Sequence, residues 1–79
     1  MAIMQITNKL QLNIMHFVDC WVKNEKTPVP RVKIIASMEA EGIKDFTVIS
    51  AIGSLIRKKY IRRAGHQGNN TFYVQLRGI

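Results

Sequence analysis

Five basic side chains lie within one run of seven positions, and these are the residues whose type and spacing best suggest a chemical role. They are Arg57, Lys58, Lys59, Arg62 and Arg63. Lysine and arginine at this density are suited to neutralising phosphate groups. A polar stretch follows at once, and its glycine and asparagine content is typical of a turn. It reads Gly65-His66-Gln67-Gly68-Asn69-Asn70.

Charge is distributed unevenly along the chain, which has a formal net charge of +7. Residues 1–45 hold six Lys/Arg and five Asp/Glu, whereas residues 46–79 hold six Lys/Arg and no acid. This asymmetry indicates one half that faces a polyanion and one that is nearly neutral. A solvated basic surface that aids solubility is the alternative. We favour nucleic acid because the charges gather beside a polar turn.

Catalytic and metal-binding patterns are weak. His16 and Cys20 lie four positions apart, but a zinc site needs a third protein ligand and His66 is the only further histidine. We favour packing of Cys20. Glu39 and Glu41 diverge on a helix, so no carboxylate pair is convincing. With no phosphate-cradling glycine motif either, we expect no enzyme, no metal, no cofactor and no small-molecule ligand.

Length and composition predict a single domain over residues 1–79, because so short a chain has little margin for burying a core. The apolar runs are too short for a membrane span, and MAIMQITNKL lacks the basic start of a signal peptide. The only cysteine, Cys20, has no partner for an intramolecular disulfide. A cytoplasmic setting is expected, nucleoid-associated if the source is bacterial.

A first helix is predicted from a cap near Thr7 to about Lys23 or Asn24. Its apolar stripe contains Leu10, Ile14, Met15, Phe17, Val18, Trp21 and Val22. The opposite side carries Gln11, Asn13, Asp19 and Lys23. Further apolar residues lie outside the stripe, namely Ile3, Ile6 and Leu12. This surplus favours a homodimer interface, with scattered exposed apolar residues as the alternative.

Two prolines in the connector over residues 24–30 end the first helix. Val29 is expected as the single rung of a short strand, and Pro30 suits the first turn of the next helix. That second helix covers about residues 31–40, with Gly42 just beyond its end. The residues it should bury are Val32, Ile35, Ala36 and either Ile34 or Met38.

The C-terminal part is predicted as a helix followed by a hairpin. Asp45 is the expected N-cap, and the core-facing residues of the helix are Val48, Ile52, Leu55 and Ile56. The strands cover residues 60–63 and 71–76, with a turn over 65–70. Alternation favours a core position for Phe72, Val74 and Leu76 and an outward one for Tyr73 and Gln75. The opposite phasing stays open.

Residues 28–76 resemble the winged helix-turn-helix superfamily. Such segments often read Ile-Ser-x-x-Thr-Val-x-x-x-Leu-x-x-Leu, and Ile43-Lys44-Asp45-Phe46-Thr47-Val48, then Ile52 and Leu55, occupy those positions. Ile35-Ala36 is similar to the Ile-Ala pair of the preceding helix in such motifs. The turn between the two helices is longer than in the tightest motifs. The resemblance implies an α+β fold of three helices and a C-terminal β-hairpin wing, with one short strand after the first helix.

In this resemblance the third helix enters a major groove of DNA and the wing lies along the backbone. The implied DNA-binding residues are Lys44, Thr47, Ser50, Ala51, Ser54, Arg57, Lys58, Arg62, Arg63, His66, Gln67, Asn69 and Asn70. The small third-helix face admits two interpretations. It approaches DNA closely, with specificity from shape and wing, or it packs on a second subunit, as in centromere-binding proteins of tubulin-type plasmid partition systems.

The function expected is sequence-specific binding of double-stranded DNA, as a homodimer that represses or otherwise regulates transcription by occupying its site. One alternative is a plasmid or phage partition or replication adaptor, which differs in target site and not in domain physics. The other is a winged-helix protein-interaction module that does not bind DNA.

Overall fold

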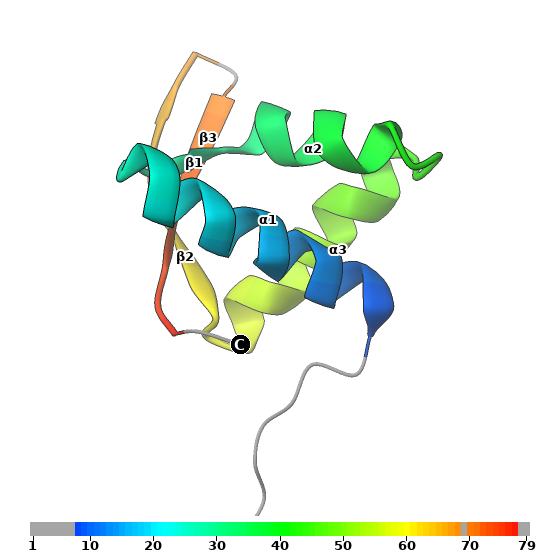
Figure 1. The fold of residues 1–79 in the computed structure, drawn as a ribbon, viewed down its shortest axis with the longest axis horizontal. Helices are drawn as coiled ribbons and strands as arrows, with labels where there is room; N and C mark the ends of the chain where they lie inside the picture. The colour runs from blue at the N-terminus through cyan, green and yellow to red at the C-terminus, as the bar shows by residue number, and fades with distance from the viewer. Residues whose placement is uncertain (1–7, 69, 78–79) are drawn as a thin grey trace, which may run out of the picture.

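A computed structural model describes residues 8–68 and 70–77. The fold is α+β, with three helices and one three-stranded antiparallel sheet, and this part of the expectation is confirmed. The chain order is α1 (Lys9–Glu25), β1 (Val29–Pro30), α2 (Arg31–Glu39), α3 (Asp45–Arg57), β2 (Ile61–Gln67) and β3 (Asn70–Gln75). The helices pack together, and the β2–β3 hairpin extends from them at one side (Figure 1).

The sheet has the order β1-β3-β2, so the last strand lies between the other two. The predicted rung at Val29 exists, and it pairs with Tyr73. Residues directly opposite in an antiparallel pair point to the same side. Because Val29 is fully buried, Tyr73 also points inward and is 2% exposed. The expectation that Tyr73 faces outward is therefore wrong, and the opposite phasing holds. Phe72 and Val74 are half-buried on the other side, and Leu76 is exposed.

One apolar core joins the helices to the sheet. Helices α1 and α3 contribute most of it, as their apolar spacing predicts. The buried apolar residues are Ile14, Met15, Val18, Val29, Ile34, Met38, Val48, Ala51, Ile52, Leu55, Tyr60, Ile61 and Tyr73. Leu10, Phe17, Trp21 and Val22 of the predicted stripe pack at its edge, as do Ile35, Ile43 and Ile56.

Helix α1 begins one residue later than expected. Asn8 is its N-cap, and the Asn8 side chain accepts a hydrogen bond from the backbone N–H of Gln11. Thr7, expected in that role, lies outside the described residues, as do Ile3 and Ile6. Gln11 was expected on the polar side of the helix and is instead 7% exposed. Its side-chain oxygen accepts a hydrogen bond from Lys58, which satisfies this buried polar group.

The buried face of helix α2 agrees only in part with the predicted one. Ile34 and Met38 are buried, whereas Val32 is half-exposed and Ala36 is exposed. Ile35 packs at the core edge. With Ile34 and Ile35 adjacent in a helix of nine residues, two stripes of nearly equal quality exist, and tertiary packing selects one of them.

The turn between α2 and α3 contains Gly42 in the position that the sequence predicts. Gly42 has φ +85°, and its N–H reaches the carbonyl of Glu39 while the next N–H, from Ile43, reaches that of Met38. These two bonds form a Schellman motif with Gly42 as the C′ residue, as predicted. Asp45 is the first residue of α3 and not its N-cap, which is Lys44. The Asp45 carboxylate still accepts the neighbouring N–H of Phe46, at 2.7 Å.

The hairpin is longer than expected on its first strand. Strand β2 continues to Gln67, so the turn is narrower than residues 65–70. Gly65 sits at a register shift after Arg63, with φ +141°, where the strand carries a bulge. In β2 only Ile61 is buried. The outer half of β2 is therefore held by its pairing with β3 and not by the core.

Candidate nucleic-acid interface

The outermost line of α3 consists of Phe46, Ser50, Gly53 and Arg57, which lie opposite the buried face of the helix at 3.6-residue spacing. Thr47 and Ser54 flank this line on one side, and Ile49 flanks it on the other. Ala51 was expected on the outer face but is 8% exposed and belongs to the core. The Ala51 side chain is therefore not available to a ligand in the way the sequence suggested.

An open hollow of about 410 Å³ lies beside this helix, between its polar flank and the start of α1. It is lined by Asn8, Leu10, Gln11, Phe46, Thr47, Ser50, Ala51 and Ser54. Four of the predicted site residues thus line one surface: Ala51, which is almost buried, and the hydroxyl-bearing Thr47, Ser50 and Ser54. Their hydroxyl groups both donate and accept hydrogen bonds, which suits phosphate oxygens or base edges.

Arg57 is turned back along the helix. Its Nη2 donates a hydrogen bond to Oγ of Ser54 at 3.1 Å. Its Nη1 lies 3.6 Å from the position that a Cβ atom on Gly53 would take. The guanidinium therefore covers the helix surface where Gly53 has no side chain of its own.

Phe46 is 65% exposed at the beginning of α3, and it is not among the site residues that the sequence predicts. The ammonium of Lys44 lies 5.8 Å from the centre of its ring. Helical spacing was the signal that places it there, since Phe46, Ser50, Gly53 and Arg57 follow one another at steps of four, three and four. Phe46 and Lys44 thus form an apolar and cationic corner at the N-terminal end of the outer line.

Lys58 differs from the other predicted phosphate-binding cations, because its side chain is engaged within the fold. Its Nζ donates to Oε1 of Gln11 at 3.0 Å, and the residue is half-buried. Its carbonyl accepts a hydrogen bond from Arg77 at 2.8 Å, and the Arg77 guanidinium stacks 4.0 Å from the centre of the Tyr60 ring. Lys58 and Arg77 therefore tie α1 and the end of β3 to the junction after α3.

Arg62 and Arg63 are both exposed at the base of the hairpin. Arg62 pairs with Val74 and Arg63 with Tyr73, so the two side chains leave opposite faces of the sheet. Nη1 of Arg62 donates to the carbonyl of Arg63 at 3.3 Å. The sequence suggested one basic cluster, but the strand geometry divides these two charges between two faces.

The other predicted wing residues are mostly strand residues. His66 and Gln67 lie in β2, opposite Thr71 and Asn70 of β3, and both are exposed. The expectation that they form a loop is wrong, since pairing continues almost to the tip. Asn69 lies outside the described residues.

The remaining polar constellation is on α1. Asp19 forms an ion pair with Lys23 at 3.0 Å and accepts an amide hydrogen bond from Gln75 at 3.4 Å. The hydrogen bond from Lys23 is the largest influence that lowers the pKa of Asp19 below its ordinary value. These contacts join the outer side of α1 to β3.

Cys20 is exposed, not packed, and its sulfur accepts a hydrogen bond from the amide of Asn24 at 3.2 Å. His16, four positions earlier, is also exposed. Within residues 8–68 and 70–77, no three His, Cys, Asp or Glu side chains are grouped so that they could hold a metal ion.

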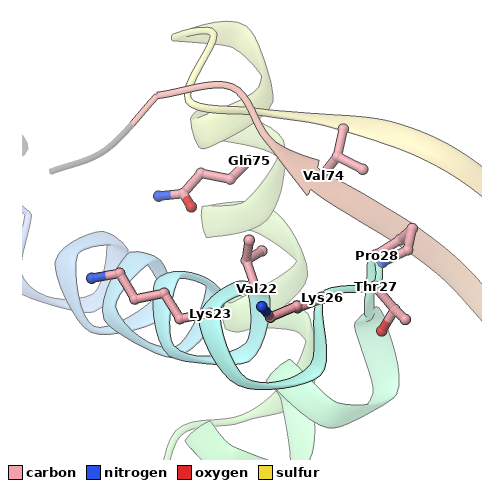
Figure 2. A pocket seen from close by; sticks show the side chains of 7 residues that line it. All are labelled: Val22, Lys23, Lys26, Thr27, Pro28, Val74 and Gln75. Atoms are coloured by element: carbon pink, nitrogen blue, oxygen red, sulfur yellow. The ribbon is translucent and has the colours of Figure 1, made fainter.

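A larger hollow of about 630 Å³ lies away from the α3 surface (Figure 2). It lies between the end of α1, the residues just before β1, and β3. Its lining residues are Val22, Lys23, Lys26, Thr27, Pro28, Val74 and Gln75. Most of its exposed lining is apolar, and Lys23 at its edge is paired with Asp19.

Comparisons with protein-family models, with curated proteins and with solved structures gave no match to this chain. Among the helices of the described residues, none has the length and apolar character needed to cross a bilayer.

Proposed function

We propose that this protein is a non-catalytic winged-helix protein that binds double-stranded DNA, with α3 in the major groove and the β2–β3 hairpin as the wing. The observation that carries the proposal is the outer line of α3. It has a single cation among small and apolar side chains, and residues 46–79 contain no acidic side chain to repel phosphates.

The dimensions of α3 suit a groove. Its 13 residues give a helix of roughly 20 Å, and the major groove of B-DNA is about 12 Å wide. Ser50 and Gly53 on the outer line add little thickness, so the helix backbone can lie close to the base edges. Thr47 and Ser54 on the flank are placed for phosphate or base contacts.

The hairpin supplies the positive charge outside the groove. Arg62 and Arg63 are exposed, and neither forms an ion pair with an acidic side chain of the described residues. Since they leave opposite faces of the sheet, only one of them starts on the side turned to any single DNA backbone. We therefore expect one of the two to dominate phosphate binding.

We further propose a homodimer that regulates transcription by occupying its site. Pairing doubles the contacted DNA and gives two half-sites, which compensates for the small reading surface of one such domain. A partition or replication role would use the same surface on a different target site.

A protein-interaction module is the second candidate, and two exposed apolar residues of α3 favour it. Phe46 is 65% exposed and Ile49 is 41% exposed, and both lie on the outward side of the helix. In this case a partner protein, and not DNA, covers α3. A DNA-binding protein should bind duplex DNA in a salt-dependent way, whereas a protein-interaction module should bind duplex DNA little or not at all.

The deciding experiment is binding to a labelled random-sequence duplex across a salt series. We expect micromolar or tighter binding at low salt, weakening steeply as salt rises. Arg62→Ala and Arg63→Ala should weaken binding to all duplexes, and the dominant one should reduce the log–log salt slope by about 0.9. Lys33→Ala, on α2, is the control that removes an exposed charge elsewhere. Absence of binding at low salt would contradict the proposal and favour the protein-interaction module.

A further inference from the structure

We propose that Arg57 is the residue through which α3 reads sequence, and that the base it reads is guanine. This inference rests on the proposed binding of double-stranded DNA and makes it more specific. From the sequence, Arg57 is one of five clustered cations suited to phosphates and one of the residues on the outward face of the third helix. Its contacts in the fold give it a different position from the others.

The guanidinium lies on the outermost line of α3. Nη1 is near the empty Cβ position of Gly53 at 3.6 Å, and Nη2 is bonded to Ser54 at 3.1 Å. When a helix lies in the major groove, its outermost line faces the base edges and its flanks face the sugar–phosphate walls. Arg57 is the only cation on that line, so it is the cation best placed to reach a base.

Ser54 holds the guanidinium in this place, beside the bare helix surface at Gly53. A Cβ atom at position 53 would lie at ordinary contact distance from Nη1, so the guanidinium lies against the helix surface there. The bond to Ser54 restricts a long side chain that would otherwise lose much conformational freedom on binding. Ser54 is in this sense a positioning residue for Arg57.

The donor count identifies the base. A guanidinium has five N–H donors, and one N–H of Nη2 is directed at Ser54. The remaining donors include a parallel pair, which matches two acceptors side by side. Guanine presents two acceptors, O6 and N7, in the major groove, whereas adenine presents one acceptor next to a donor. The other outer-line residues, Phe46, Ser50 and Gly53, offer no comparable fork.

The test begins with selection of binding sites from a random duplex library by the wild-type protein. Affinities are then measured for the selected duplex and for duplexes in which each G·C pair in turn is replaced by A·T. We expect one replacement to weaken wild-type binding about 5- to 150-fold. Arg57→Ala should bind the selected duplex more weakly and should no longer distinguish it from that one replacement.

Three further variants separate base reading from charge. Arg57→Lys retains the charge but not the planar fork, so it should keep its binding to the replaced duplex and lose discrimination. Arg62→Ala should weaken both duplexes equally. Ser54→Ala should reduce discrimination when Arg57 is present and should not change discrimination in the Arg57→Ala background. Thermal unfolding of each variant shows that it folds.

Each failure has a distinct meaning. If the wild-type protein binds no duplex, the proposed DNA-binding function is wrong. If it binds and selects a site, but Arg57→Ala weakens all duplexes equally and keeps full discrimination, then only the guanine inference is overturned and Arg57 contacts phosphate. Binding with no sequence preference at all also overturns it.

Discussion

The ammonium group of Lys58 donates a hydrogen bond to the side-chain oxygen of Gln11, 3.0 Å away, and joins residues that are 47 positions apart. Gln11 is the one buried polar side chain of the described residues. A cation that the sequence places in a phosphate-binding cluster thus satisfies a polar group at the junction of α1 and α3. We therefore expect Lys58 to contribute to folding stability more than to phosphate binding.

Lys58→Met tests this directly. The substitution keeps an apolar stem but leaves the buried Gln11 oxygen without its donor, which should lower the free energy of unfolding by about 1–2 kcal/mol. Urea unfolding measures it. The double variant Gln11→Leu/Lys58→Met removes both partners and should recover most of the loss. Equal stability of Lys58→Met and the wild-type protein would show that this bond contributes nothing.

Arg77→Met should destabilise the end of β3. It removes the stacking on Tyr60 and the hydrogen bond to the carbonyl of Lys58, together worth about 1 kcal/mol. The unfolding midpoint should fall, while the salt dependence of DNA binding should change less than in Arg62→Ala or Arg63→Ala. A larger effect on DNA binding than on stability would place Arg77 in the interface instead.

Two glycine-to-alanine changes should have opposite signs. Gly42 has φ +85° with open space around its Cβ position, so Gly42→Ala is disfavoured by backbone conformation alone, by about 1 kcal/mol. Gly53 is inside α3 and an added Cβ would meet only Arg57 at ordinary contact distance. Gly53→Ala should therefore stabilise the fold by about 0.5–1 kcal/mol. Thermal unfolding of the two variants measures these changes. A stability change of the same sign in both variants would contradict this prediction.

Asp19 should make the free energy of unfolding depend on pH in the acidic range. Its pKa is lowered in the folded state, chiefly by the hydrogen bond from Lys23 and also by that from Gln75. A depressed carboxyl pKa contributes stability that is complete above the unfolded-state value, near 3.8, and is lost as pH falls through the lower folded value.

Urea midpoints measured from pH 6 down to pH 2.5 test this. Asp19→Asn should lower stability at pH 6 and reduce the loss on acidification. Glu25→Gln, on the same helix, is the matched control and should leave the profile close to wild type. If Asp19→Asn and the wild-type protein have parallel profiles, the ion pair with Lys23 does not influence folding.

Much of the fold follows from local sequence signals. The two prolines, Gly42 and the apolar spacing of α1 and α3 placed three helices and a hairpin in the right order. Val29 was predicted as a strand rung because β-branched valine lies between prolines. These signals are local, since each depends on residues a few positions apart.

The wrong predictions concern residues whose burial depends on contacts with residues far away in the sequence. The burial of Tyr73 depends on its register with Val29, and that of Gln11 depends on Lys58. The face of α2 was ambiguous because Ile34 and Ile35 are adjacent. At the candidate site, most residues of the outer face of α3 could be predicted from helical spacing. The burial of Ala51 and the position of the Arg57 side chain over Gly53 could not, because both depend on how the helix packs and on side-chain conformation.

The β2–β3 hairpin can diverge in sequence separately from the helices. From Arg62 to Gln67 the side chains of β2 are exposed, so they contribute little to the core that holds the helices together. Substitutions there should be tolerated by the fold at small cost. The fold and the contacts made by the hairpin can therefore vary independently, and exchanging residues 62–67 offers a route to new binding preferences on an unchanged scaffold.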